Sequence, residues 1–108
     1  TGLICVENTH NRGGGAIYSI DSLRAIRSIV EDHNIPLHLD GARVFNAGAA
    51  SDTPIAEIAR CADTLSFCLS KGLGAPFGSL VAGAKDLIKE ARRYRQVFGG
   101  GMRQAGIM

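Results

Sequence analysis

Short apolar runs that end abruptly at polar residues or glycine are the feature that most constrains how this sequence can fold. Three runs have the β-branched composition and the length of buried strands, and they cover residues 3–6, 35–39 and 64–69. A fourth short strand is expected at residues 79–82. Each of the first three runs is followed directly by turn-forming or charged residues, which predicts that every strand stops at a sharp boundary.

The segments between these runs carry the spacing and the capping residues of helices. The first expected helix begins at Ser19 or Asp21 and ends near His33 and Asn34. Further helices are expected over residues 44–50, from Thr53–Pro54 to about Arg60, and over 86–97. The order strand, helix, strand, helix, strand, strand, helix fits parallel strands with helical crossovers, so we predict the α/β class with a mostly parallel sheet.

Composition excludes several classes of protein. The chain has 108 residues, 45% of them hydrophobic and 20% charged, which is typical of a globular domain and not of a disordered segment. The formal charge of +2 is too small to imply a nucleic-acid or membrane partner. No apolar run approaches the roughly 20 residues of a membrane span, and no targeting leader follows Thr1. We expect a segment from within a larger domain.

Cysteines and histidines give no sign of a disulfide framework or a metal site. Cys5, Cys61 and Cys68 lack the CxxC spacing and lie among apolar residues, which predicts buried thiols and a reducing compartment. The three histidines and the cysteines show no metal-ligand spacing, so no metal is expected.

Three polar clusters follow the predicted strands: residues 7–10, 40–43 and 70–72. Ligands of open α/β sheets bind beyond the carboxyl ends of the strands. If the strands are parallel, all three clusters lie at one edge, where a carboxylate, a guanidinium and an ammonium group converge.

Lys71 is the strongest candidate for a functional residue, because it follows an apolar strand and lies among small residues instead of on a charged helix face. A lysine with a lowered pKa forms Schiff bases, and the neighbouring glycines leave room for a bulky partner. The alternative is a solvated lysine on a glycine-rich turn. The segment lacks the spacing of a phosphate-binding loop.

Asp40 and Arg43 are the next candidates. A carboxylate at the end of an apolar strand needs a partner, and Asp40 could cap the next turn, pair with Arg43, or bind the protonated ring nitrogen of pyridoxal phosphate. The fork of Arg43 suits a substrate carboxylate. His38 shares the face of Asp40 and is interpreted as a packing residue. Arg103, after three glycines, could reach a phosphate or a neighbouring subunit.

These residues together resemble the low-specificity L-threonine aldolases, which are fold-type-I, aminotransferase-like pyridoxal-phosphate enzymes of the β-eliminating lyase group. The matching segments are ENTHN (7–11), LHLDGAR (37–43), CLSKGLGAPFGS (68–79) and GGGMRQAG (99–106). The resemblance extends over essentially the whole chain. It implies that residues 1–108 are an internal segment of the three-layer α/β/α cofactor-binding large domain, without the phosphate cup and the C-terminal small domain.

The resemblance also implies site roles and an activity. Lys71 would hold pyridoxal 5'-phosphate as an internal aldimine, Asp40 would pair with its ring nitrogen, and Arg43 would bind cofactor and substrate carboxylate. Arg103 would lie near the cofactor and the subunit interface. The implied reaction is retro-aldol cleavage of threonine-like amino acids to glycine and an aldehyde. The implied protein is a cytoplasmic homo-oligomer, a dimer or tetramer. Alternatives are another β-eliminating lyase, a catalytically silent segment, or a binding module.

Overall fold

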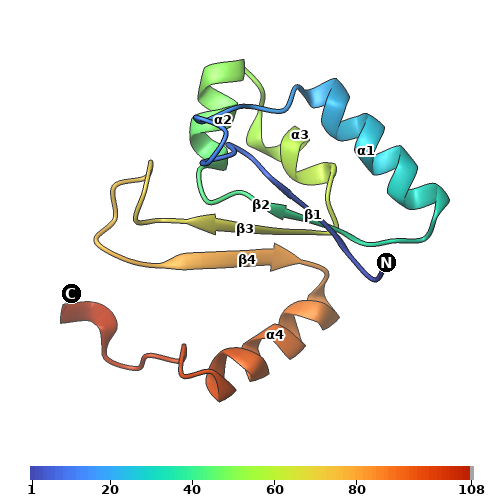
Figure 1. The fold of residues 1–108 in the computed structure, drawn as a ribbon. Coiled ribbons are helices and arrows are strands. Elements are labelled where there is room, and N and C mark those ends of the chain that lie inside the picture. Colours follow the sequence, from blue (N-terminus) through green and yellow to red (C-terminus); the bar gives the residue numbers. More distant parts are fainter. Residues whose placement is uncertain (108) are drawn as a thin grey trace.

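A four-stranded sheet with the strand order β1–β2–β3–β4 organises the structure (Figure 1). This computed structural model describes residues 1–107. Strands β1 (Ile4–Glu7), β2 (Leu37–Asp40) and β3 (Thr64–Cys68) are parallel. Strand β4 (Ser79–Gly83) pairs antiparallel with β3. The predicted α/β class and mostly parallel sheet are therefore confirmed.

Three helices cover one face of the sheet, and a fourth lies along β4 on the other side (Figure 1). The covering helices are α1 (Ile20–Asp32), α2 (Val44–Ser51) and α3 (Ile55–Arg60). Of the two predicted caps of α1, the structure uses Ser19, whose Oγ accepts a hydrogen bond from the amide of Ser22 at 3.1 Å. Helix α4 (Lys85–Val97) follows β4, and a short 3₁₀ turn (Ala105–Ile107) comes last.

The hydrophobic core lies between the sheet and helices α1–α3. Alternation along β2 turns Leu37 and Leu39 into this core, where each is 1% exposed. The same alternation turns His38 and Asp40 to the opposite face, which α1–α3 do not cover. Strand β2 thus separates an apolar face that holds the fold from a polar face that is available for chemistry. The other buried hydrophobic residues are Leu23, Val30, Val44, Ala47, Ile58, Cys61 and Leu65.

The second face and the β4–α4 region are sparsely covered by residues 1–107. Every residue of β4 is exposed, and α4 buries none of its side chains. Cys5 is also exposed, so the expectation of a buried thiol is wrong at this position, whereas it is confirmed for Cys61, and Cys68 is only partly buried. The physical reason is register: Cys5 pairs with His38 and shares its uncovered face. No helix within residues 1–107 is long and apolar enough to cross a membrane.

Candidate functional site

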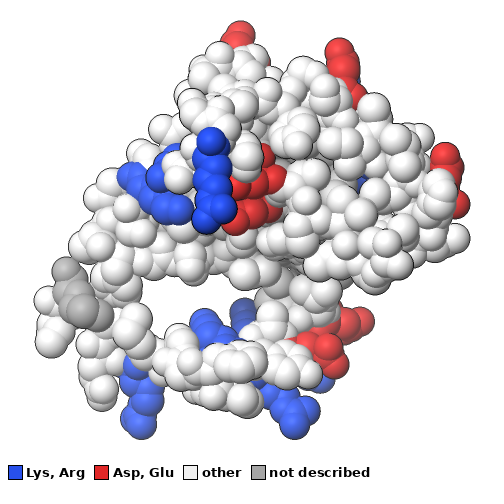
Figure 2. Space-filling view, viewed as in Figure 1, with Lys and Arg blue, Asp and Glu red and all other residues white. Residues whose placement is uncertain are grey.

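The ends of β1, β2 and β3 meet at one edge of the sheet, as parallel pairing requires. Glu7 and Asp40, the last residues of β1 and β2, are register partners. The amide of Asn8 donates to the carbonyl of Asp40 at 2.9 Å, which carries the pairing one residue further. Figure 2 shows acidic and basic side chains side by side at this edge. The predicted convergence of the three polar clusters is confirmed at the level of the strands.

Asp40 is exposed at this edge, and one of its two carboxylate oxygens is already engaged. Its Oδ1 accepts a hydrogen bond from the amide of Ala42 at 3.0 Å, so the residue caps the turn that follows β2. Among the described residues it makes no ion pair with Arg43. Its Oδ2 is therefore the oxygen that can accept a hydrogen bond from a ligand.

Arg43 occupies the position just before α2 and is half-buried. Its carbonyl accepts hydrogen bonds from the amides of Asn46 and Ala47, at 3.0 and 3.1 Å, which anchors its backbone in the first turn of the helix. Its guanidinium forms no ion pair within residues 1–107. The first turn of α2 thus holds the backbone of Arg43 close to Asp40. The side-chain N–H donors of Arg43 can therefore bind an anion.

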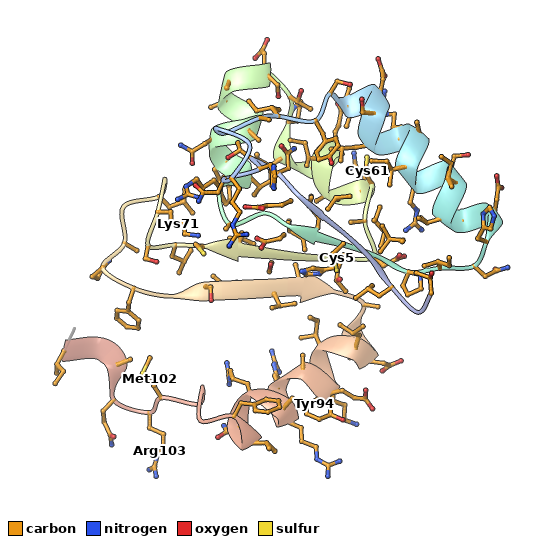
Figure 3. The ribbon with its side chains drawn as sticks, viewed as in Figure 1. Cys5, Cys61, Lys71, Tyr94, Met102 and Arg103 are labelled. Atoms are coloured by element: carbon orange, nitrogen blue, oxygen red, sulfur yellow. The ribbon has the colours of Figure 1, made fainter. Side chains whose placement is uncertain are left out.

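Lys71 lies in the loop that joins β3 to β4, and its side chain is exposed (Figure 3). The loop is closed by two backbone hydrogen bonds, from Leu69 to the carbonyl of Gly78 at 2.9 Å and from Ala75 to that of Leu69 at 3.0 Å. The loop also packs against α2. A Cβ added to Gly72 would collide with the side-chain amide of Asn46 in that helix. This contact connects the lysine loop to the helix that begins beside Arg43.

Asn8 is a residue whose character the sequence alone did not reveal. It is 0% exposed, its Oδ1 accepts from the amide of Tyr18 at 3.3 Å, and its Nδ2 has no partner among residues 1–107. A buried amide hydrogen without an acceptor is costly, by about 1–3 kcal/mol. The position of Asn8 directly after an apolar strand indicated that it could belong to a functional site. Nothing in the sequence indicated that its side chain is buried.

Glu7, in contrast, is engaged by its own loop. Its Oε1 accepts from the amide of Asn11 at 3.1 Å, and its Oε2 lies 3.6 Å from Nε2 of His10. The side chain of Glu7, which belongs to the first polar cluster, therefore stabilises the loop after β1 through these contacts.

Arg103 is not brought to this edge by the structure. It lies in the segment after α4, is exposed, and points away from Lys71 (Figure 3). The structure therefore gathers Asp40, Arg43 and Lys71, while the role of Arg103 stays a prediction.

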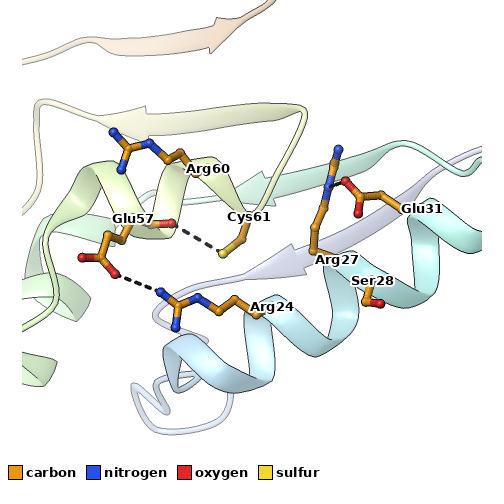
Figure 4. Close-up of a pocket in the computed structure, with 7 residues that line it drawn as sticks. All are labelled: Arg24, Arg27, Ser28, Glu31, Glu57, Arg60 and Cys61. Atoms are coloured by element: carbon orange, nitrogen blue, oxygen red, sulfur yellow. Dashed lines mark hydrogen bonds and ion pairs between the residues drawn. The ribbon is translucent and has the colours of Figure 1, made fainter.

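A groove between α1 and α3 also carries charged side chains (Figure 4). Arg24 pairs there with Glu57 at 3.2 Å. Arg27 pairs with Glu31 through Nε and, at 2.8 Å, with Asp63 through a terminal nitrogen. Burial raises the pKa of the Cys61 thiol, which disfavours a reactive thiolate. These arginines are satisfied by acids of the same chain, so the groove serves to join the two helices. No cluster of three or more metal-ligating side chains occurs within residues 1–107.

Comparison with known proteins identifies the family of this chain. The beta-eliminating lyase family matches residues 1–108. Low-specificity L-threonine aldolase 1 of Arabidopsis thaliana is 44% identical over 108 residues, which are 100% of this chain and 30% of that protein. Low specificity L-threonine aldolase of Escherichia coli K12 is 45% identical over 108 residues, 100% of this chain and 32% of that protein.

Solved structures share the fold. A crystal structure from Exiguobacterium sp. 255-15, provisionally described as an aromatic amino acid beta-eliminating lyase/threonine aldolase, superimposes with a TM-score of 0.88 at 30% identity. The match covers 93% of this chain and 28% of that chain. The chain thus spans about a third of the length of these two aldolases, 30% and 32%, and 28% of the solved chain.

Proposed function

Since this chain belongs to the beta-eliminating lyase family, we propose that the natural protein carrying it is a pyridoxal-phosphate-dependent aldehyde-lyase. Its substrates are L-threonine, L-allo-threonine and related β-hydroxy-α-amino acids, and its products are glycine and an aldehyde. The observation that carries this proposal is the position of Asp40, Arg43 and Lys71 at one edge of the sheet. The names of the relatives support the substrate class.

The residues at this edge fit pyridoxal phosphate. The cofactor has an aldehyde for an amine, a basic ring nitrogen for a carboxylate, and oxygen acceptors for an amide. Lys71 supplies an exposed amine, Asp40 has Oδ2 available, and Asn8 has a buried amide without an acceptor among residues 1–107. These three groups, one for each feature of the cofactor, support the proposal.

When bound, the cofactor supplies an electron sink for the pair released from the Cα–Cβ bond of the substrate. Lys71 would hold the cofactor through its Nζ atom. Asp40 keeps a proton on the ring nitrogen through a charge-assisted hydrogen bond from that nitrogen to Oδ2. Arg43 orients the substrate by a two-point contact with its carboxylate.

We extend the proposal to the setting of the protein. Residues 1–108 form part of the cofactor-binding large domain of a cytoplasmic homo-oligomer, a dimer or tetramer. Arg103 contacts the cofactor phosphate or a neighbouring subunit. The apolar side chains exposed on β4 and α4 support burial against further protein, and they include Leu80, Val81, Leu87 and Val97.

The experiment compares the wild-type natural protein, loaded with pyridoxal phosphate, with a Lys71→Ala variant on L-threonine. We expect equal amounts of glycine and acetaldehyde from the wild type and a loss of at least about 1,000-fold in Lys71→Ala, because a covalent step is removed. Lys89→Ala, an exposed lysine of α4, is the control and should keep full activity.

Two results contradict the proposal. Release of ammonia and a keto acid in place of glycine would assign the protein to another reaction of the β-eliminating group. Full aldehyde release by Lys71→Ala would remove Lys71 from the chemistry.

A further inference from the structure

His38 takes part in a row of hydrogen-bonding side chains on the sheet face that α1–α3 leave uncovered. Its Nδ1 lies 2.7 Å from Oγ1 of Thr64, and its Nε2 lies 3.4 Å from Oγ of Ser66. Both hydroxyls belong to β3, and His38 belongs to β2, so the ring bridges two strands. The imidazole is half-buried and held at both nitrogens, which fixes its plane.

Ser66 connects this row to the site. It is the register partner of Asp40, and the alternation of β3 places its side chain on the face that carries His38 and Asp40. Its carbonyl accepts the amide of Gly41 at 2.8 Å, so its backbone is fixed beside the end of β2. A serine hydroxyl has one proton and two lone pairs. It can therefore accept from the Nε2 hydrogen of His38 and donate to a carboxylate at the same time.

We propose that Ser66, oriented by His38, is a positioning residue for Asp40. In this arrangement Thr64 donates to Nδ1 of His38, His38 donates from Nε2 to Ser66, and Ser66 donates to the Asp40 carboxylate. The amide of Ala42 already donates to Oδ1 of that carboxylate, and the proposed bond from Ser66 would add a second donor. A lone pair of Oδ2 would remain for the ring nitrogen of the cofactor. This inference rests on the proposed function, because it assigns Asp40 to that nitrogen.

The test uses the full natural protein and measures its dissociation constant for pyridoxal phosphate by absorbance, along with kcat and KM for L-threonine. Ser66→Ala removes the hydroxyl, and Ser66→Thr keeps it on a side chain suited to a strand. Cys5→Ala is the matched control, since Cys5 flanks His38 from β1 on the same face. Thermal midpoints of the cofactor-free proteins report any general loss of structure.

We expect Ser66→Ala to raise the dissociation constant for the cofactor roughly tenfold and to lower kcat by a similar factor, as loss of a hydrogen bond to a charged group would do. KM should change less than about twofold because Arg43 is untouched. Ser66→Thr should restore both values to within about twofold, and Cys5→Ala should leave them unchanged. His38→Leu should reproduce the Ser66→Ala pattern with a similar KM.

Three results overturn the inference. Ser66→Ala could bind cofactor and turn over like the wild type, Ser66→Thr could fail to rescue it, or its losses could follow its thermal midpoint alone. A wild-type protein that fails to bind pyridoxal phosphate gives a different pattern, and that result would overturn the proposed function together with this inference.

Discussion

Gly41 donates its backbone amide to the carbonyl oxygen of Ser66 at 2.8 Å, one residue beyond the end of β2. This bond continues the β2–β3 ladder to the point where the chain turns into α2. A Cβ on Gly41 would lie 2.5 Å from Cδ1 of Leu65 and 2.9 Å from Cβ of Val44. The chain can therefore leave the sheet between Asp40 and Arg43 only because residue 41 has no side chain.

Gly41→Ala should destabilise the protein by about 1–3 kcal/mol, the usual cost of forcing a methyl group into a packed site. It should also weaken cofactor binding, because the displaced backbone lies between Asp40 and Arg43. Thermal unfolding of the cofactor-free protein measures the first effect. Gly2→Ala is the control, since nothing lies within 4 Å of its added Cβ. Equal midpoints for the two variants would refute the steric account.

Asp40→Asn keeps an oxygen for the amide of Ala42 and removes the negative charge. We expect kcat to fall by roughly 10–100-fold, because a charge-assisted hydrogen bond contributes about 1.5–3 kcal/mol. Absorbance should show that Lys71 still captures the cofactor. The exposed Asp32 gives the control Asp32→Asn. Unchanged turnover in Asp40→Asn would show that Asp40 does not serve the ring nitrogen.

Arg43→Ala should raise KM for L-threonine by roughly 10–100-fold through loss of the two-point contact with the substrate carboxylate. The dissociation constant for pyridoxal phosphate should change much less. Steady-state kinetics and cofactor titration separate the two effects, with the exposed Arg60→Ala as control. The reverse pattern, weak cofactor binding with a normal KM, would assign Arg43 to the phosphate.

Asp63 links stability to pH. The amide of Leu37 and then the guanidinium of Arg27 donate to its Oδ2, each at 2.8 Å, and they lower its pKa below the ordinary value of 3.8. Because the folded pKa is depressed, the stabilisation is present above about pH 3.8 and is lost as pH falls through the lower folded value.

Asp63→Asn should therefore destabilise the protein by less than about 1 kcal/mol near neutral pH, because the Asp63 side chain is 41% exposed and solvent screens its pair with Arg27, and by progressively less below about pH 3.8. Urea unfolding at a series of pH values measures this difference. Asp21→Asn is the control, because the Asp21 side chain is 88% exposed in its pair with Arg24. A constant difference between wild type and Asp63→Asn at all pH values would contradict the assigned cause.

The sequence was sufficient to predict the elements and the edge where the polar clusters meet, because these depend on local patterns and on the rule for parallel strands. It could not predict the direction of β4. That direction depends on the loop after Cys68, where Gly74 and Gly78 adopt φ values of 72° and 114° and reverse the chain. The exposure of Cys5 likewise depends on which face the helices leave uncovered.

The finer features of the site depend on register, which no local pattern specifies. The sequence left three possible roles for Asp40. The structure shows one of them, the capping of the next turn through a hydrogen bond from the amide of Ala42. His38 was interpreted as a packing residue, yet its two ring nitrogens lie near hydroxyls of β3, and the burial of Asn8 was not expected at all.

The most direct test of the account is a borohydride trap on the natural protein incubated with pyridoxal phosphate, followed by peptide mass mapping. Borohydride reduces a carbon–nitrogen double bond between cofactor and lysine to a stable single bond. We predict a phosphopyridoxyl group on Nζ of Lys71, and no such group on Lys85 or Lys89. An unmodified Lys71 peptide from protein that holds the cofactor would contradict the central assignment.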